Sequence, residues 1–192
     1  MIQGFLVWFI KLTPSTKRWF WKAWYNLFAN RSKEHSFRFM NYGYMEAGFE
    51  LNLLQTDEGE RYPIQLYHHT ATQIDIEGKR VLEVGSGRGG GASYIQRYLK
   101  TSSLTGIDIS ESAIQLCKTS HKIEGLDFVQ GDSENIPFLN DGFDVVLNVE
   151  SSHCYGNIPI FLSEVVRVLK PGGNFLWCDF RTHKEMENLF NM

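Results

Sequence analysis

A glycine-rich segment at residues 85–91 is the stretch of the sequence best suited to holding a cofactor. It has the sequence GSGRGGG and follows the apolar run 81–85, so it lies where a strand is expected to end and a helix to begin. Glycines let the backbone turn sharply and approach a ligand with no Cβ in between. The spacing fits both G-x-G-x-G and G-x-G-x-x-G, so the loop alone leaves two classes of cofactor open.

Carboxylates gather around the expected position of this loop. Glu83 lies two residues before the first glycine, Asp108 ends the next apolar run, and the third run leads into GDSE at 131–134. Asp108 can accept hydrogen bonds from two ribose hydroxyls, with capping of the following helix as the alternative. The 131–134 edge can accept from an adenine amino group. Carboxylates repel a pyrophosphate and attract a sulfonium with an α-amino group, so they favour S-adenosylmethionine over a dinucleotide.

A histidine and an aspartate are the candidates for acid–base chemistry. His153 follows the fourth apolar run and Asp179 ends the fifth. Because neighbouring parallel strands end at one edge of a sheet, we expect the two side chains to meet there, with Asp179 orienting or charge-stabilising His153. A histidine within hydrogen-bond reach of an alcohol can remove its proton as a methyl group arrives. The alternative is a loop histidine that bonds only to backbone.

Composition is typical of one globular domain. The 192 residues are 43% hydrophobic and 21% charged, which excludes a globally disordered chain. The formal net charge of −3 offers no electrostatic case for binding nucleic acid. Three widely spaced cysteines predict neither a disulfide framework nor a zinc site, and the histidines have no metal-ligand spacing, so we expect no metal. Reduced thiols indicate a cytoplasmic location.

From residue 81 onward, short β-rich runs alternate with helical patterns. The runs are nearly continuous in apolar residues, as expected of parallel strands covered on both faces. The alternation predicts an α/β fold with a doubly wound, mostly parallel sheet, and a turn is expected at KPGG, residues 170–173. The expected strands are 81–85, 104–108, 126–131, 143–149 and 174–180, and the expected helices are 90–100, 111–121, 157–169 and 184–192.

Together, the motifs resemble those of a known family. VLEVGSGRGG, TGIDIS, FVQGDSENIPF, FDVVLNVESSH and RVLKPGG are similar to the motifs of class I S-adenosylmethionine-dependent methyltransferases. More narrowly, RYPIQLYHHTATQIDIEGKRVLEVGSGRGGGASY, LDFVQGDSENIPF and VVLNVESSHCY resemble the phthiotriol/phenolphthiotriol dimycocerosate methyltransferase family. The resemblance covers residues 40–180 and implies O-methylation of a hydroxyl on a lipid or other hydrophobic small molecule. It also supports a histidine base at His153.

The resemblance implies roles for the matching residues. Asp108 would take the ribose hydroxyls, with Ile109 against the adenine. A helix over residues 62–70 would cover the cofactor through Tyr67 and His68, the alternative being a packed amphipathic helix with surface histidines. The implied cofactor-binding set is Glu83, Gly85, Gly87 and Gly89 in the loop, Asp108 and Ile109, Asp132 and Ser133 at the adenine edge, Asn148 and Glu150 at the methionine end, and Tyr67 and His68.

The N-terminal segment differs in composition from the rest. The first 33 residues carry six basic and no acidic side chains, and 14 of the 27 aromatic residues precede residue 50. Thr13 and Pro14 predict a helix to Ala29 with an apolar stripe and basic flanks, which favours peripheral association with a membrane surface. The alternative is an arm that packs as a lid or forms a homodimer contact. The chain thus divides into an arm (1–49), a cofactor-covering region (50–80) and a methyltransferase core (81–192).

The chain departs from the family pattern at its end. Seven strands in the order 3-2-1-4-5-7-6 complete that fold, whereas this sequence ends soon after the fifth expected strand. We therefore expect strands 6 and 7 to be missing, as in a fragment, an incomplete gene product or a shortened paralogue. Two other functions compete with an active methyltransferase. One is a non-catalytic cofactor-binding remnant, and the other is an NAD(P)-dependent oxidoreductase, which only the G-x-G-x-x-G spacing supports.

Overall fold

The protein is described by a computed structural model that covers residue 16 and residues 38–191. Its centre is one sheet of five strands in the order β3-β2-β1-β4-β5, and every pairing of neighbouring strands is parallel. The result confirms the predicted α/β fold and the predicted order of the first five strands. The strands are β1 (Arg80–Val84), β2 (Ser103–Asp108), β3 (Leu126–Gln130), β4 (Phe143–Val149) and β5 (Leu169–Cys178).

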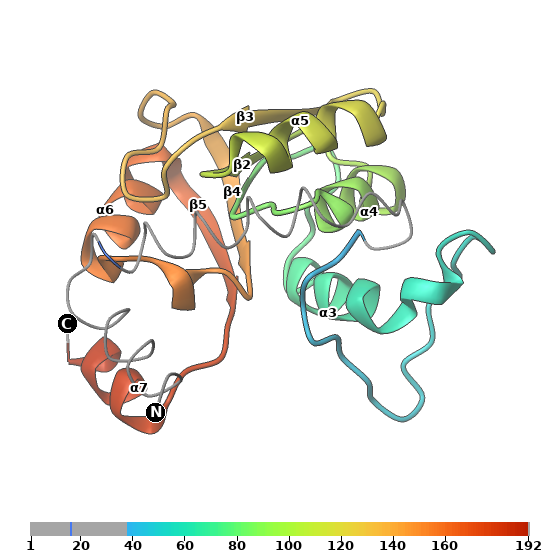
Figure 1. Cartoon of the computed structure of the whole chain (residues 1–192), viewed down its shortest axis with the longest axis horizontal. Helices are drawn as coiled ribbons and strands as arrows, with labels where there is room; N and C mark the ends of the chain where they lie inside the picture. Colours follow the sequence, from blue (N-terminus) through green and yellow to red (C-terminus); the bar gives the residue numbers. More distant parts are fainter. Residues whose placement is uncertain (1–15, 17–37, 192) are drawn as a thin grey trace.

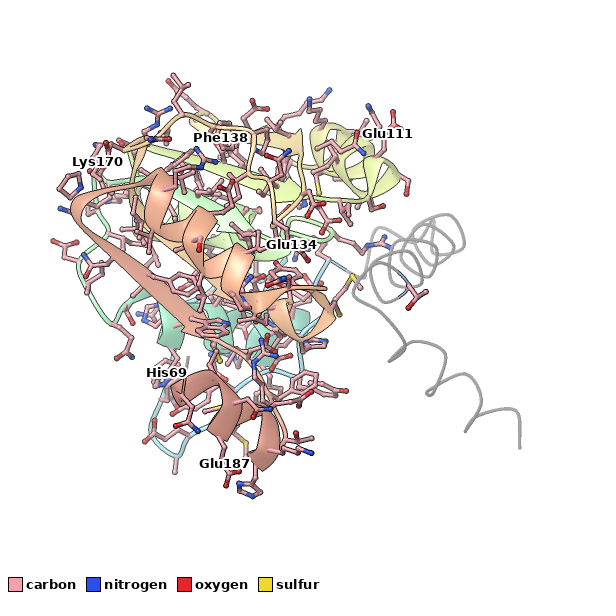
Figure 2. All side chains as sticks on the ribbon, turned by 90° about the vertical axis from the view of Figure 1, so that its left-hand side faces the viewer. His69, Glu111, Glu134, Phe138, Lys170 and Glu187 are labelled. Atoms are coloured by element: carbon pink, nitrogen blue, oxygen red, sulfur yellow. The ribbon has the colours of Figure 1, made fainter. Side chains whose placement is uncertain are left out.

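Helices cover both faces of this sheet (Figure 1). One apolar cluster joins the sheet to α3 (Arg61–Ala71), α4 (Gly90–Leu99) and α5 (Glu111–Ser120). A second cluster joins the opposite face to α6 (Ile158–Val168), the face seen in Figure 2. The remaining elements of the described chain are η1 (Glu58–Glu60), η2 (Ser152–Cys154) and α7 (His183–Phe190).

Alternation along the central strands explains why both faces are apolar. In β1, Val81 belongs to the cluster on the α3–α5 face and Leu82 to the cluster on the α6 face. In β4, Val145 and Val146 divide in the same way, and all four side chains are at most 1% exposed. A strand buried on both faces needs apolar residues at successive positions, which is the pattern that the sequence shows.

The segment 170–173 differs from its prediction as a turn before the last strand, because it lies inside β5. Pairing passes from Phe143–Leu169 directly to Val145–Asn174, so β5 has extra residues over this interval. Gly172 there has φ of +78°, a conformation that glycine adopts without strain. The glycines therefore form a bulge within a strand, which bends the strand without ending it.

The predicted surface helix from Pro14 to Ala29 lies, apart from Thr16, outside the described residues. Among the residues that are described, no helix has both the length and the apolar character needed to cross a bilayer.

Candidate functional site

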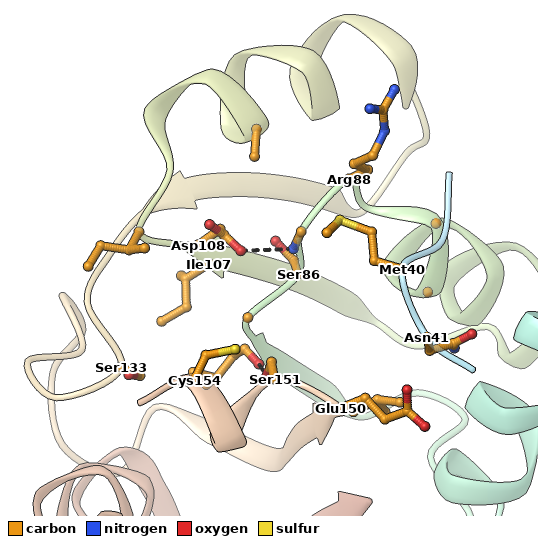
Figure 3. Close-up of a pocket in the computed structure, with 18 of the residues that line it drawn as sticks. Met40, Asn41, Ser86, Arg88, Ile107, Asp108, Ser133, Glu150, Ser151 and Cys154 are labelled. Atoms are coloured by element: carbon orange, nitrogen blue, oxygen red, sulfur yellow. Dashed lines mark hydrogen bonds between the residues drawn. The ribbon is translucent and has the colours of Figure 1, made fainter. Parts of the chain in front are cut away.

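A pocket lies beyond the carboxyl ends of β1, β2 and β4, where a doubly wound sheet binds its ligands (Figure 3). The loop after β1 forms one wall, and the segments 131–134 and 149–151 form others. Most of the predicted cofactor residues meet here although they come from separate elements. Those that line the pocket are Tyr67, Gly85, Gly87, Asp108, Ile109, Asp132, Ser133 and Glu150.

The loop between β1 and α4 depends on glycine at defined positions. Gly85 has φ of +80°, and an added Cβ would lie 2.3 Å from the Oγ atom of Ser151. Its amide donates to the carbonyl of Ile107 at 2.8 Å, which ties the loop to β2. Gly89 has φ of +77° and is the N-cap of α4, but it does not line the pocket. Gly85 therefore shapes the pocket wall, whereas Gly89 turns the chain into the helix.

Asp108 at the end of β2 connects this loop to α5. Its Oδ2 atom accepts from the amide of Gly87 at 3.0 Å (Figure 3). Its Oδ1 atom accepts from the amide of Ser110, the N-cap of α5, at 2.8 Å. Burial raises the pKa of Asp108 above its ordinary value, against the effect of these bonds. Since a carboxylate has about four acceptor sites, each oxygen can still accept a hydrogen bond from a ligand hydroxyl.

Glu83 lies beneath the pocket wall and does not line it, in contrast to the expectation. It is fully buried, and its Oε1 atom accepts from the hydroxyl of Tyr67 at 2.7 Å. Burial raises the pKa of Glu83 to about 7, assisted by the charge of Asp108 and opposed by the bond from Tyr67. Tyr67 itself lines the pocket, and its ring fills the space beside Gly91. Glu83 can therefore act on a ligand through Tyr67 and through its charge.

Asn148 and His68 also lie away from the pocket lining. The amide nitrogen of Asn148 donates to the carbonyl of Val84 at 2.9 Å, so this fully buried side chain ties β4 to β1. His68 lies on another face of α3, where its Nδ1 atom is 2.6 Å from the hydroxyl of Tyr94. Burial lowers the pKa of His68. This placement matches the packed-helix alternative for His68.

Residues 38–41 form a wall of the pocket that the sequence analysis did not anticipate. The guanidinium of Arg38 holds this segment to Asp57, at 3.0 Å, and to Glu60. The next amide, that of Tyr42, donates to the Oε2 atom of Glu150 at 2.8 Å. These partners lie far apart in the sequence, so spacing contains no signal that would have identified them.

His153 and Asp179 meet at the rim of the pocket, as predicted. The Nδ1 atom of His153 lies 2.8 Å from Oδ1 of Asp179, and the backbone amide of His153 donates to Oδ2 at 2.8 Å. Burial lowers the pKa of His153, but the bonds and charges of Asp179 and Cys154 together outweigh it and raise the pKa to about 9. Neither residue lines the pocket directly, although Glu150 and Cys154 beside His153 do. His153 therefore lies next to the pocket and is hydrogen-bonded to Asp179.

Three residues that the sequence analysis missed lie behind this pair. Ser152, Trp177 and Arg181 form a connected set of hydrogen bonds with Asp179. Ser152 is fully buried, and the side chain of Arg181 is 7% exposed. Phe180 lies on the other side of His153, with the two ring centroids 4.2 Å apart.

Comparison with known proteins shows similarity to methyltransferases. A family profile described as "Methyltransferase domain" matches residues 82–177, which is half of the chain. A phthiotriol/phenolphthiotriol dimycocerosates methyltransferase of Mycobacterium tuberculosis is 50% identical over 175 residues, or 91% of this chain and 65% of that protein. A fatty-acid O-methyltransferase of Mycolicibacterium smegmatis is 51% identical over 161 residues, or 83% of this chain and 59% of that protein. The chain thus spans less than two thirds of the length of either relative.

A solved structure agrees with this similarity at the level of the fold. An S-adenosylmethionine-dependent methyltransferase of Mesorhizobium loti superposes with a TM-score of 0.52 at 20% identity, over 56% of this chain and 50% of that one.

Proposed function

The chain belongs to the methyltransferase-domain family, and on this premise we propose that it transfers the methyl group of S-adenosylmethionine to an oxygen atom of a hydrophobic acceptor. The observation that carries the proposal is the pocket beyond the strand ends, with its glycine loop and the Asp108 carboxylate. In this proposal the pocket binds the cofactor, and the His153–Asp179 pair at its rim acts on the acceptor.

The groups around the pocket suit a cationic cofactor. Four carboxylates line it, those of Asp108, Asp132, Glu134 and Glu150, against two guanidinium groups. One of these, Arg38, is already bound to two carboxylates outside the lining. A pyrophosphate would be repelled by such a wall, whereas a sulfonium and an α-amino group are attracted to it. When bound, S-adenosylmethionine supplies a methyl group that is already activated for transfer.

We assign the cofactor contacts by position along the pocket. Asp108 holds the ribose because both of its oxygens have acceptor sites left. Glu150 and Tyr67 lie at the methionine end, with Glu83 and Asn148 supporting that end from beneath. The adenine is assigned to Ile109, Asp132 and Ser133. In this assignment Gly89 and His68 do not contact the cofactor and have structural roles only.

For an alcohol acceptor, His153 is assigned as the base. In the neutral tautomer that the geometry favours, Nδ1 donates its hydrogen to Asp179 and Nε2 takes up the proton of the acceptor hydroxyl. The bound cofactor would supply the methyl group to the acceptor oxygen, and His153 would take up the proton that the hydroxyl loses. Most of the rate enhancement comes from holding the two reactants in line, because the donor is already activated.

A carboxyl acceptor is the second candidate, and the raised pKa of His153 favours it. With a pKa of about 9, His153 is mostly protonated at neutral pH. A fatty-acid carboxylate needs no base at that pH and is attracted to an imidazolium. The similarity to a fatty-acid O-methyltransferase supports this acceptor, and the similarity to a phthiotriol methyltransferase supports an alcohol.

One assay separates the two acceptors. The full chain is incubated with S-adenosylmethionine labelled on its methyl group and with either 1-hexadecanol or hexadecanoic acid, and the labelled ether or ester is measured. We expect transfer to at least one probe. The alcohol rate should rise with pH towards 9, because only neutral His153 accepts a proton, whereas the acid rate should not. Binding of the cofactor without transfer to either probe would support the non-catalytic remnant.

We also propose that the N-terminal arm brings the enzyme to a membrane surface, where a lipid acceptor would be found. The support is the excess of six basic residues in the first 33, together with the aromatic residues. Each cation contributes on the order of 1 kcal/mol near an anionic surface. Deleting residues 1–33 should abolish pelleting with anionic vesicles and leave cofactor binding intact. Unchanged pelleting after the deletion would contradict the proposal, and loss of solubility would favour a packed lid.

A further inference from the structure

The His153–Asp179 pair has a second layer of polar side chains behind it. We propose that Ser152 and Arg181 are positioning residues for the transfer reaction, because they hold the Asp179 carboxylate in the orientation in which it binds the imidazole of His153. This inference rests on the proposed role of His153. It assigns a function to two buried polar groups that contact neither the pocket nor the cofactor assigned to it.

Ser152 is the centre of this second layer. Its hydroxyl accepts from Nε1 of Trp177 at 2.9 Å and from a guanidinium nitrogen of Arg181 at 2.6 Å, and it donates to Oδ2 of Asp179. A hydroxyl has one hydrogen to donate and two lone pairs to accept. All three are used here, so the hydrogen of Ser152 points at Asp179 and cannot turn elsewhere.

Asp179 is held through both of its oxygens. Oδ2 receives the Ser152 hydroxyl and the backbone amide of His153, and Oδ1 receives the His153 ring and the amide of Phe180 at 2.8 Å. Although burial opposes it, the bonds from His153 and Ser152 keep the pKa of Asp179 below its ordinary value. The bonds to Oδ2 fix the plane of the carboxylate, which in turn fixes where Oδ1 meets the imidazole.

Arg181 adds a charge to this geometry. Its guanidinium lies over the ring of Trp177, with 5.4 Å between the guanidinium carbon and the ring centroid, and 3.5 Å from Oδ2 of Asp179. A charge buried to this degree is costly unless it is paired. Asp179 is therefore shared by Arg181 and by His153 when the latter is protonated. Because like charges repel, Arg181 favours the neutral imidazole, which is the form that a base requires.

A purely structural role would be a tie between η2 and the segment after β5. The two roles differ in what happens to the imidazole. A tie affects only stability, whereas a positioning residue also changes the proton affinity of His153 and the turnover number. The decisive measurement is the titration of His153, which requires no acceptor.

The experiment follows the histidine ring signals of the full chain by NMR between pH 5 and 10, with His153→Gln used to assign the signal. Arg181→Met removes the charge and Ser152→Ala removes the central hydroxyl. Arg181→Met is expected to raise the pKa of His153 by about 0.5 to 1, because a nearby cation is lost. Ser152→Ala is expected to lower it by about as much, because the Asp179 carboxylate that raises it is no longer held against the ring. Arg181→Gln is the substitute if Arg181→Met does not fold. Arg80→Met is the matched control, since Arg80 also lies over a ring, that of Phe143, at the other end of the sheet.

Turnover of the same variants is measured with hexadecanoic acid and 1-hexadecanol. We expect kcat to fall about 3- to 30-fold with KM for the cofactor unchanged, and the alkaline rise in the alcohol rate to follow the pKa of His153, upward in Arg181→Met and downward in Ser152→Ala. An unshifted His153 titration in Ser152 and Arg181 variants that melt at lower temperature would overturn the inference and leave a structural tie. If the wild type methylates neither probe, the proposed function fails, while the titration still decides whether this layer controls His153.

Discussion

At the proposed cofactor end of the pocket, backbone amides of two loops meet a single carboxylate, whereas at the proposed acceptor end side chains from several segments surround one histidine. Asp108 receives the amides of Gly87 and Ser110, and these three residues belong to β2 and to the two turns beside it. His153 depends instead on Asp179 and, through it, on a layer contributed by η2, β5 and the segment that follows β5. The two ends therefore differ in construction.

This difference indicates which end of the site can vary. Backbone contacts persist under most side-chain substitutions, so the cofactor end depends mainly on glycine positions and on one acid. A side-chain network loses several bonds when one member changes. We therefore expect substitutions at the cofactor end to alter affinity and those at the acceptor end to alter rate. The following predictions test this division.

The largest effect is expected at the acceptor end. His153→Ala should lower the rate of alcohol methylation by about 10²- to 10⁴-fold and leave cofactor affinity nearly unchanged, because a base acts on the acceptor proton. Stopped assays with calorimetric titration of the cofactor measure both quantities. His183→Ala is the control, since His183 is an exposed histidine nearby. More than half of the wild-type rate between pH 6 and 9 would show that His153 is only a rim residue.

A glycine substitution should have the next largest effect, on affinity. Gly85→Ala places a Cβ 2.3 Å from the Oγ atom of Ser151 and should weaken cofactor binding by about a hundredfold. Gly172→Ala is a close control, because its φ of +78° is similar and nothing lies within 4 Å of its added Cβ. Both should lose about 1–3 kcal/mol of stability from backbone strain. Equal cofactor affinities for the two variants would contradict the assignment of the loop.

Asp108→Ala should weaken cofactor binding by about 1–3 kcal/mol through the loss of charged hydrogen bonds to the ribose. At saturating cofactor the rate should stay within about threefold of the wild type, which distinguishes this end from His153. Calorimetric titration and saturation kinetics provide the two numbers. Asp127→Ala, an exposed acid on β3, serves as the control. Wild-type affinity in Asp108→Ala would remove this residue from the site.

The smallest effect is expected from Glu83, which acts from beneath the pocket. Its pKa of about 7 means that it gains a negative charge as the pH rises through neutrality, so a cationic cofactor should bind more tightly above pH 7 than below it. We expect a gain of about threefold to tenfold between pH 6 and 8 in the wild type and a flatter profile in Glu83→Gln. Identical pH profiles of cofactor affinity in the wild type and in Glu83→Gln would show that the charge of Glu83 does not affect cofactor binding.

The sequence by itself determined the sheet, the loop after β1 and the acid that ends β2. These features need only neighbouring residues: apolar runs form strands, glycines permit a turn at Gly85, and strand ends gather at one edge. The pairing of His153 with Asp179 was also predictable, because adjacent parallel strands bring their ends together. The sequence predicts a turn at residues 170–173, whereas the structure has a bulge there. Turns and bulges share the same glycine-rich composition, and only the pairing of β5 with β4 distinguishes them.

Only the tertiary structure decided which polar side chains surround the pair and which predicted residues reach the pocket. Glu83 and Asn148 have the expected places in the sequence but point into packed layers, and His68 lies on the wrong face of its helix. Arginine is usually a surface residue, and the sequence gives no sign that Arg38 pairs with Asp57 and Glu60 or that Arg181 bonds to Ser152. The physical reason is that the hydrophobic periodicity of the sequence determines local secondary structure. The contacts of long polar side chains form only when segments distant in the sequence pack together. In this protein that packing determines the surroundings of the His153–Asp179 pair, the proposed acceptor end of the site.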